Sequence, residues 1–304
     1  MIVTPDFLFT EGRSARDDAW FVEVGEVLAR GWKAYLERYR YSPPDIPGTW
    51  LAWLDSGLPA EAPACAEFVQ LLLHQPRPSR LTEQARVLTA LARSGYAIHS
   101  EWASRIHETL ELLFDTCRRD GGWCDALQPQ PQQPSCPVVT ACVLEALGAF
   151  GLRWGQPMAQ HAVRFILARQ EETGLWTDLW QVFAGLAAVG YDLTAIGVRR
   201  AVRGLKELQN DDGGWGTPRS TPGATAVAVL ALLIADEPDC PEVQAGAEYL
   251  VGTQRADGFW HEATATVLQA LGRYLRAVHG PALSELLHDL ALGDCPVVRS
   301  PHAA

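Results

Sequence analysis

A short segment ending in Gly-x-Trp recurs in this chain and constrains its fold more than any other feature. The four copies end at Trp123, Trp176, Trp215 and Trp260, with successive spacings of 53, 39 and 45 residues. The three later copies also carry a Gln before the Gly, at Gln170, Gln209 and Gln254. A recurring unit of this size predicts supersecondary units that stack and share one continuous core.

The stretches between these segments read as helices of two alternating kinds. Those that follow a Gly-x-Trp segment are rich in Ala and Leu and apolar on all sides, which is typical of buried helices. The others have a charged face and are expected to cover the core. Twelve helices are predicted near 14–40, 61–75, 80–95, 100–118, 136–150, 156–171, 177–190, 193–210, 222–235, 241–255, 262–279 and 281–291.

This alternation favours an all-α fold in which six inner and six outer helices form a closed (α/α)6 toroid. An open superhelix is the alternative. Each Gly is expected to turn the chain sharply out of an outer helix, and each Trp N–H to find a buried partner. The Gln side chains are expected to bond free N–H groups at the start of the next helix.

The 304 residues, 48% of them hydrophobic, suffice for one such toroid. It is predicted to span 14–292, after an N-terminal extension at 1–13 and before a disordered tail at 293–304. The aromatic-rich segment between Trp20 and Trp53 is expected to complete the ring and plug one end.

The net charge of −11, with only two lysines, disfavours a nucleic-acid partner. The sequence contains no signal-peptide pattern and no apolar run long enough to span a membrane. A cytoplasmic location is therefore expected, and the oligomeric state is left open.

Over roughly 80–290, the repeated Gln-x(3–5)-Gly-x-Trp pattern resembles the QW motif of squalene-hopene and oxidosqualene cyclases, the class II terpene cyclases. The resemblance implies an (α/α)6 toroid that holds an apolar, isoprenoid-type small molecule and needs no cofactor. These cyclases carry Asp-x-Asp-Asp-Thr-Ala at the start of one inner helix. The best-matching helix here reads CPVVTA over 136–141, with Val138 at the position of the proton donor.

A cyclase or isomerase with non-standard acid chemistry is therefore the first hypothesis. The same Thr-Ala alignment puts Glu262 at the proton-donor position of another helix, directly after His261. Asp178 and Glu83 fall one place further along on their own helices, so the four side chains are expected to converge at one end of the ring. Glu262 is the leading acid or base, since an apolar cavity raises the pKa of a carboxyl. Capping of helix N-termini is the alternative role for Asp178 and Glu83.

The substrate cavity is expected to be apolar and to be lined by Trp176, Trp180 and Phe183, with Cys136 and Val138 at its edge. Two further hypotheses stay open. A prenyltransferase-like enzyme would use a diphosphate with Mg or Zn, drawing metal ligands from Cys136, Asp178, His261 and Glu262 and charges from Arg199, Arg200 and Arg203. A toroid without catalytic activity would bind a lipid or a protein.

Overall fold

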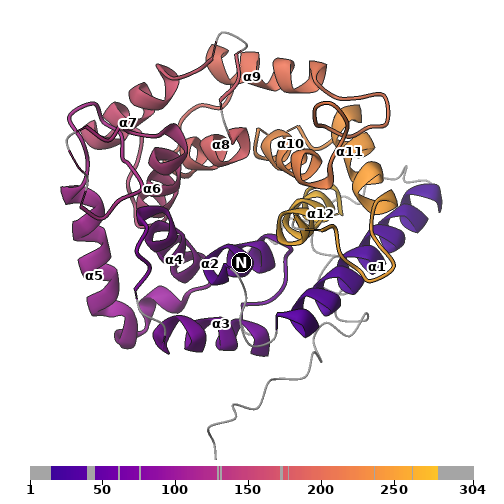
Figure 1. Cartoon of the computed structure of the whole chain (residues 1–304), viewed down its shortest axis with the longest axis horizontal. Coiled ribbons are helices and arrows are strands. Elements are labelled where there is room, and N and C mark those ends of the chain that lie inside the picture. Colours follow the sequence, from indigo (N-terminus) through magenta and orange to yellow (C-terminus); the bar gives the residue numbers. More distant parts are fainter. Residues whose placement is uncertain are drawn as a thin grey trace, which may run out of the picture.

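The computed structural model describes residues 15–39, 45–60, 62–74, 77–128, 130, 132–171, 174–176, 178–235, 237–261 and 263–279. These residues form twelve α-helices and no β-strand, together with a short 3-10 turn, η1, at Tyr96–Ile98. The helices alternate between two concentric rings around a central opening (Figure 1).

The inner ring is built from the even-numbered helices. They are α2 (Ile46–Asp55), α4 (Leu81–Arg93), α6 (Pro137–Ala149), α8 (Leu179–Ala188), α10 (Pro222–Ile234) and α12 (Thr264–His279). The outer ring is built from α1 (Ala15–Arg38), α3 (Pro63–His74), α5 (Ser100–Asp115), α7 (Pro157–Leu167), α9 (Ile196–Glu207) and α11 (Pro241–Gly252). Each inner helix packs against the next, and α12 packs against both α2 and α1.

The ring is closed, which confirms the predicted toroid and excludes an open superhelix for the described residues. The closing contacts join the first helices to the last. Gln254 Nε2 donates to the Val27 carbonyl of α1 at 3.0 Å, and Ser56 Oγ, at the end of α2, donates to the Leu268 carbonyl of α12 at 3.2 Å.

The inner helices approach one another closely because their facing residues are small. A Cβ atom added at Gly185 of α8 would lie 2.4 Å from the Ala141 carbonyl oxygen of α6. One at Gly148 of α6 would lie 2.6 Å from the Ala188 carbonyl oxygen of α8. Such separations are far inside van der Waals contact, so only glycine fits at these two positions.

The Gly-x-Trp segments join four of the outer helices, α5, α7, α9 and α11, to the inner helices that follow them. The four indole Nε1 groups donate at 2.7–2.8 Å to main-chain carbonyls of the preceding outer helices, at Leu113, Ile166, Leu205 and Leu250. In three copies the Trp main-chain N–H also donates to an inner-helix Thr hydroxyl: Thr140, Thr225 and Thr264. These threonines belong to the Thr-Ala pairs of the sequence and occupy equivalent positions.

The prediction that the Gln side chains accept hydrogen bonds from free main-chain N–H groups is wrong. Each Gln donates through Nε2 to two carbonyl oxygens instead of bonding free N–H groups. Gln209, for example, donates to Gly213 within its own segment at 2.8 Å and to Glu242, in the first turn of the next outer helix, at 2.9 Å. The Gln thus bridges consecutive hairpins through its amide hydrogens.

The N-terminal region differs from the prediction in one element. Ile46–Asp55 forms an inner helix that the sequence pattern does not predict, and Trp50 and Trp53 on it are almost completely buried. The predicted helix at 281–291, like the segments 1–13 and 293–304, lies outside the described residues. In the part of the chain that the structure describes, no helix is long and apolar enough to cross a membrane.

Candidate active site in the central cavity

A cavity of about 250 Å³ lies inside the inner ring, close to the lower end of the usual range for ligand pockets. It reaches from the N-terminal ends of α2 and α12 to the second half of α4 and α6. The expectation of an apolar cavity is wrong for this part of the ring. Its lining includes four charged side chains and two glutamines: Asp45, Arg86, Arg93, Glu145, Gln181 and Gln269.

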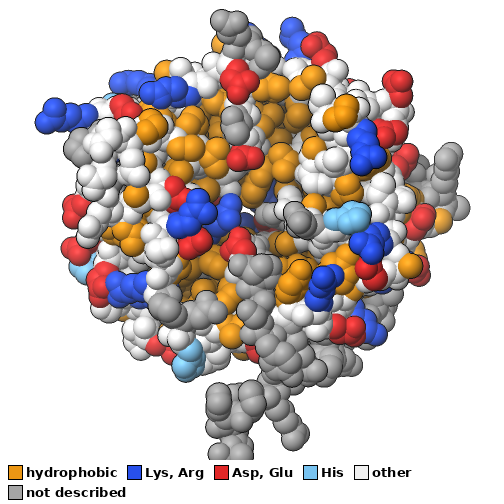
Figure 2. Space-filling model, viewed as in Figure 1, with side chains coloured by type: hydrophobic (Ala, Val, Ile, Leu, Met, Phe, Trp, Pro, Cys, Tyr) orange, Lys and Arg blue, Asp and Glu red, His pale blue; other side chains and the backbone are white. Residues whose placement is uncertain are grey.

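The two sides of the opening differ in character. Figure 2 shows hydrophobic side chains over α8 and α10, above the centre of the view, and charged side chains gathered on the side of α2 and α4. The charged side follows from helical spacing, since Arg86 and Arg93 are seven residues apart and therefore lie on one face of α4. The ring thus presents an amphipathic interior.

At the mouth, Arg86 pairs with Asp45 at 3.2 Å. Asp45 is fixed in place because its side chain also accepts the main-chain N–H of Gly48 at 2.9 Å and caps α2. Tyr35 and Tyr39, from the end of α1, line the same region. The Tyr35 hydroxyl is hydrogen-bonded to Thr49 Oγ1 at 2.9 Å.

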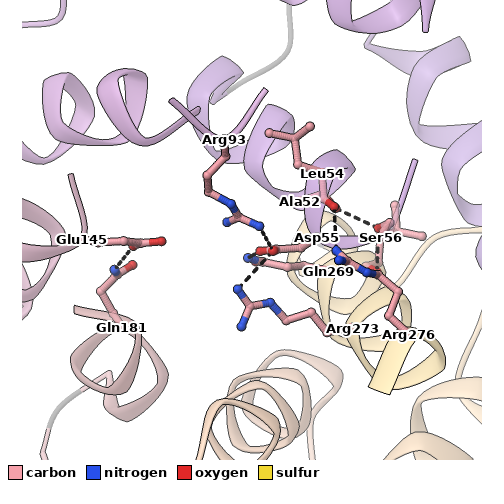
Figure 3. Close-up of polar contacts among 11 residues, drawn as sticks. Ala52, Leu54, Asp55, Ser56, Arg93, Glu145, Gln181, Gln269, Arg273 and Arg276 are labelled. Carbon is pink, nitrogen blue, oxygen red and sulfur yellow. Dashed lines mark hydrogen bonds and ion pairs between the residues drawn. The ribbon is translucent and has the colours of Figure 1, made fainter. Parts of the chain in front are cut away.

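Deeper in the ring, the Asp55 carboxylate is surrounded by donors from two other helices (Figure 3). Arg93 of α4 donates to Oδ1, Arg273 of α12 lies 3.0 Å from Oδ1, and Gln269 donates to Oδ2. Burial alone would raise the pKa of Asp55, but the charges of Arg273 and Arg93 and the hydrogen bonds hold it below its ordinary value. Asp55 therefore remains ionised.

Glu145 is the opposite case and faces the Asp55 cluster across the cavity (Figure 3). It lies on α6, and its Oε2 accepts a hydrogen bond of 2.8 Å from Gln181 Nε2 on α8. Burial raises the pKa of the Glu145 carboxyl, while the Gln181 hydrogen bond and the charge of Arg93 oppose that rise only in part. A carboxyl of this kind carries a proton nearer to neutral pH than an ordinary Glu and is suited to act as a general acid.

Sequence reasoning missed Glu145, although the sequence contains a signal for it. It is the only charged residue in the thirteen residues of α6. It also lies seven residues after Val138, so both belong to one face of the helix, about 10 Å apart along its axis. An acid is therefore present on the helix that aligns with the family's acid motif, two turns further into the ring.

The structure describes three of the four acid and base candidates predicted from the sequence, and it does not bring these three together at the cavity. His261 lines the cavity, and its Nδ1 lies 3.3 Å from Arg255 Nη1. Asp178 is exposed at the N-cap of α8 and makes no capping hydrogen bond. Glu83 is half-buried in the first turn of α4, and neither it nor Asp178 is among the residues lining this cavity. Glu262 lies outside the described residues.

Of the predicted lining residues, Trp180 lies on the cavity. Trp176 and Phe183 are buried in the helix packing, where their rings make an edge-to-face contact at 6.4 Å, and they do not line this cavity. Cys136 and Val138 are half-buried at the start of α6 and are likewise not on it. Aromatic residues at helical spacing here serve mainly as core.

The features required by a diphosphate-using enzyme are not assembled at the cavity. Within the described ranges, no three His, Cys, Asp or Glu side chains are grouped so as to hold a metal ion. Arg199, Arg200 and Arg203 are exposed on α9, an outer helix.

Comparison with known proteins agrees with this architecture. Residues 126–270 match the model of the squalene-hopene cyclase C-terminal domain family. A squalene–hopene cyclase of Zymomonas mobilis is 30% identical over 42% of this chain, and a squalene hopane cyclase of Aspergillus fumigatus is 26% identical over 83% of it. The chain spans only 23% and 42% of the lengths of these relatives, respectively.

Among solved structures, a type II terpene cyclase from Scytonema, in complex with its substrate geranylgeranyl dihydroxybenzoate, has a TM-score of 0.65. The match covers 86% of this chain and 99% of that protein, at 14% sequence identity. This similarity establishes the fold, and the four Gly-x-Trp segments account for it physically.

Proposed function

Because the chain is a member of the squalene-hopene cyclase-like superfamily, we propose that it is a class II terpene cyclase-type enzyme whose proton donor is Glu145. The observation that carries this proposal is the position of Glu145. Burial raises the pKa of its carboxyl, and Glu145 lines the cavity. On the Thr-Ala alignment, its helix corresponds to the one that carries the acid motif in the cyclases that the sequence resembles. The substrate is an isoprenoid-type small molecule bound inside the ring.

The reaction begins with a proton transfer from the carboxyl. The O–H bond of Glu145 breaks as its proton adds to the substrate. At an alkene a C–H bond forms with the electrons of the π bond, which leaves a carbocation; at an epoxide an O–H bond forms and the C–O bond opens, which leaves the electron-poor carbon and a hydroxyl group. The π electrons of a second double bond then form the ring-closing C–C bond. Loss of a C–H proton to a base gives a product isomeric with the substrate. A single carboxyl is better matched to an epoxide or an enol than to an unactivated alkene.

The surroundings of Glu145 suit both of its protonation states. Before the transfer, burial favours the neutral acid. After it, the new carboxylate is stabilised by the Gln181 amide and by the positive charge of Arg93. Trp180 also lines the cavity, and the π system of an indole stabilises a developing cation. His261 and Glu262 are the candidates for the base that takes the final proton.

The test is a product search by mass spectrometry. Purified protein is incubated with linear isoprenoids, their epoxides, prenylated aromatics and prenyl diphosphates, with and without Mg. We expect a ring-closed product of unchanged mass, and at least a hundredfold slower formation by a folded Glu145→Gln variant. Glu248→Gln, on the exposed face of α11, is the matched control and should retain full activity.

Three results would contradict the proposal in different ways. If Glu262→Gln abolished product formation and Glu145→Gln did not, the proton donor would be Glu262 and not Glu145. Release of diphosphate would indicate a transferase. No conversion of any compound would overturn the cyclase assignment and favour a toroid that binds without catalysis.

A further inference from the structure

The charged groups in and around the cavity form a nearly balanced set. Among the described residues, three arginines meet three carboxyls there: Arg86, Arg93 and Arg273 with Asp45, Asp55 and Glu145. With all six ionised the sum is zero. When Glu145 carries the proton that acid catalysis requires, one positive charge is left over. A charge that is partly enclosed by helices is hydrated less completely than one in bulk water, so a bound anion is favoured there.

Arg86 is the arginine best placed to receive that anion. Arg93 and Arg273 share the almost completely buried Asp55, whose side chain is 2% exposed. Arg86 instead pairs with Asp45, whose side chain is 45% exposed at the mouth, and its own side chain is 31% exposed. A guanidinium has five N–H donors in a planar fork and can bind a carboxylate through two of them while keeping a second partner.

Resting on the proposed function, we infer that the substrate is an isoprenoid with a carboxylate head group, that Arg86 binds this carboxylate, and that its binding is coupled to protonation of Glu145. The apolar chain would lie toward α8, where Trp180 lines the cavity. The bound anion favours the neutral form of Glu145 through like-charge repulsion. Reciprocally, protonated Glu145 favours binding of the anion.

A singly charged head group fits the charge count better than a diphosphate does. Protonation of Glu145 leaves one surplus positive charge, whereas a diphosphate carries several negative charges. Diphosphates are usually held with Mg²⁺ bound to protein carboxylates. In the described chain, no group of acidic side chains is arranged to supply such ligands.

The coupling is assigned to Glu145 because the groups packed directly against it are permanently charged, are neutral, or have pKa values shifted away from the neutral range. From α4 it faces Arg93 and lies near Arg86, and from α12 it faces Arg273, all permanently charged. On its own helix, burial raises the pKa of the Cys142 thiol to about 12. From α2, Asp55 has a lowered pKa, and from α8, Gln181 is neutral. His261, Asp45, Tyr35 and Tyr39 lie around the mouth.

The first experiment compares two probes that differ only in the head group, farnesoate and farnesol, by binding calorimetry. We expect farnesoate to bind about tenfold to a hundredfold more tightly. The Arg86→Gln variant should lose this preference. The control is Arg80→Gln, which removes another Arg–Asp pair, at 2.7 Å from Asp125, from the N-cap of the same helix and should keep the preference.

The second experiment measures proton uptake when farnesoate binds, from calorimetry in buffers of different ionisation enthalpy between about pH 5 and pH 8, above the ordinary Glu pKa. We expect uptake of up to one proton per bound ligand. It should disappear in Glu145→Gln. It should persist in His261→Gln, Asp45→Asn and Glu262→Gln, which remove the other carboxyl and imidazole side chains near the mouth and in the adjoining segment.

Equal affinity for the two probes, or a preference that survives in Arg86→Gln, would overturn the inference. So would uptake that does not depend on Glu145, and so would tighter metal-free binding of farnesyl diphosphate than of farnesoate. Failure of this inference can be distinguished from failure of the proposed function. Anion preference can fail while Glu145-dependent cyclisation stands, and proton-coupled binding can hold in a protein that forms no product.

Discussion

The Gln181 amide of α8 donates a hydrogen bond of 2.8 Å to the Glu145 carboxyl of α6. The two helices are neighbours in the inner ring, and their close approach depends on Gly185 and Gly148. The orientation of the candidate acid is therefore set by the packing of two helices and by no flexible loop.

Replacing Gln181 should change the pH range of catalysis. The amide hydrogen bond favours the ionised form of Glu145, so Gln181→Met is expected to raise the pKa of the carboxyl. The acid form then persists to higher pH, and the limb of the pH–rate profile on which activity falls as pH rises should move upward. Gln244→Met removes a similar but exposed contact, to Glu248 at 3.1 Å, and should leave the profile unchanged. Identical pH–rate profiles in the two variants would show that Gln181 does not influence the pKa of the catalytic acid.

Glu145→Gln should make the protein more stable at neutral pH. The pKa of Glu145 is higher in the folded chain than in the unfolded chain, because burial disfavours its charge. Stability therefore falls as pH rises from the ordinary Glu value of about 4.3 through the folded value. The neutral Gln avoids this loss and should raise the free energy of unfolding at pH 7 by about 0.5–2 kcal/mol. Denaturant unfolding at about pH 4 should show little difference, since there the carboxyl is largely protonated in both states.

Asp55 should have the opposite influence on stability. Its folded pKa lies below the unfolded value, so its contribution is present above about pH 4 and is lost as pH falls through the folded value. Asp55→Ala leaves Arg93 and Arg273 facing each other without their shared carboxylate and should cost about 3–5 kcal/mol at pH 7. Glu108→Ala breaks the solvent-exposed pair with Arg77 and should leave stability nearly unchanged, because water screens the interaction. An equal decrease in the free energy of unfolding for the two variants, measured in urea, would show that the buried cluster around Asp55 contributes no more stability than an exposed ion pair.

Gln254 should control the closure of the ring. Its Nε2 joins the last Gly-x-Trp segment to Val27 of α1, so Gln254→Leu should speed amide hydrogen exchange in α1. Its Oε1 is buried without a partner among the described residues, which limits the expected loss of stability to about 1 kcal/mol. Gln209→Leu breaks the equivalent bridge to α11 and should leave exchange in α1 unchanged. Similar exchange in the two variants would show that α1 is held mainly by its side-chain packing.

The repeat made the architecture predictable, because four Gly-x-Trp segments at near-regular spacing also fix where the helices lie between them. Helix α2 was not predictable in the same way. No such segment precedes it, and Pro47 and Gly48 resemble a loop when read as sequence. In the ring, Pro47 occupies the first turn of the helix, where proline is tolerated, and tertiary packing of Trp50 and Trp53 supplies the stability.

The candidate site was predictable only in part, because its residues meet through ring closure. Aligning helix starts found His261, which lines the cavity, but it also selected Asp178, which is exposed. Glu145 lies in the third turn of its helix, so an alignment of helix starts does not reach it. A single acidic residue in an otherwise apolar inner helix is the pattern that would have identified it.

The bridge from Gln254 to Val27 spans 227 residues and has a consequence for the order of synthesis. Helix α1 leaves the ribosome before the other described helices, but one of the surfaces it packs on, α12, is the last of them to be made. The part of α1 that packs on α12 therefore stays uncovered by that helix while the intervening hairpins are synthesised. In a linear repeat protein each new unit can pack on the preceding one as it is synthesised. In this ring, the packing of α1 on α12 can form only after α12 has been synthesised.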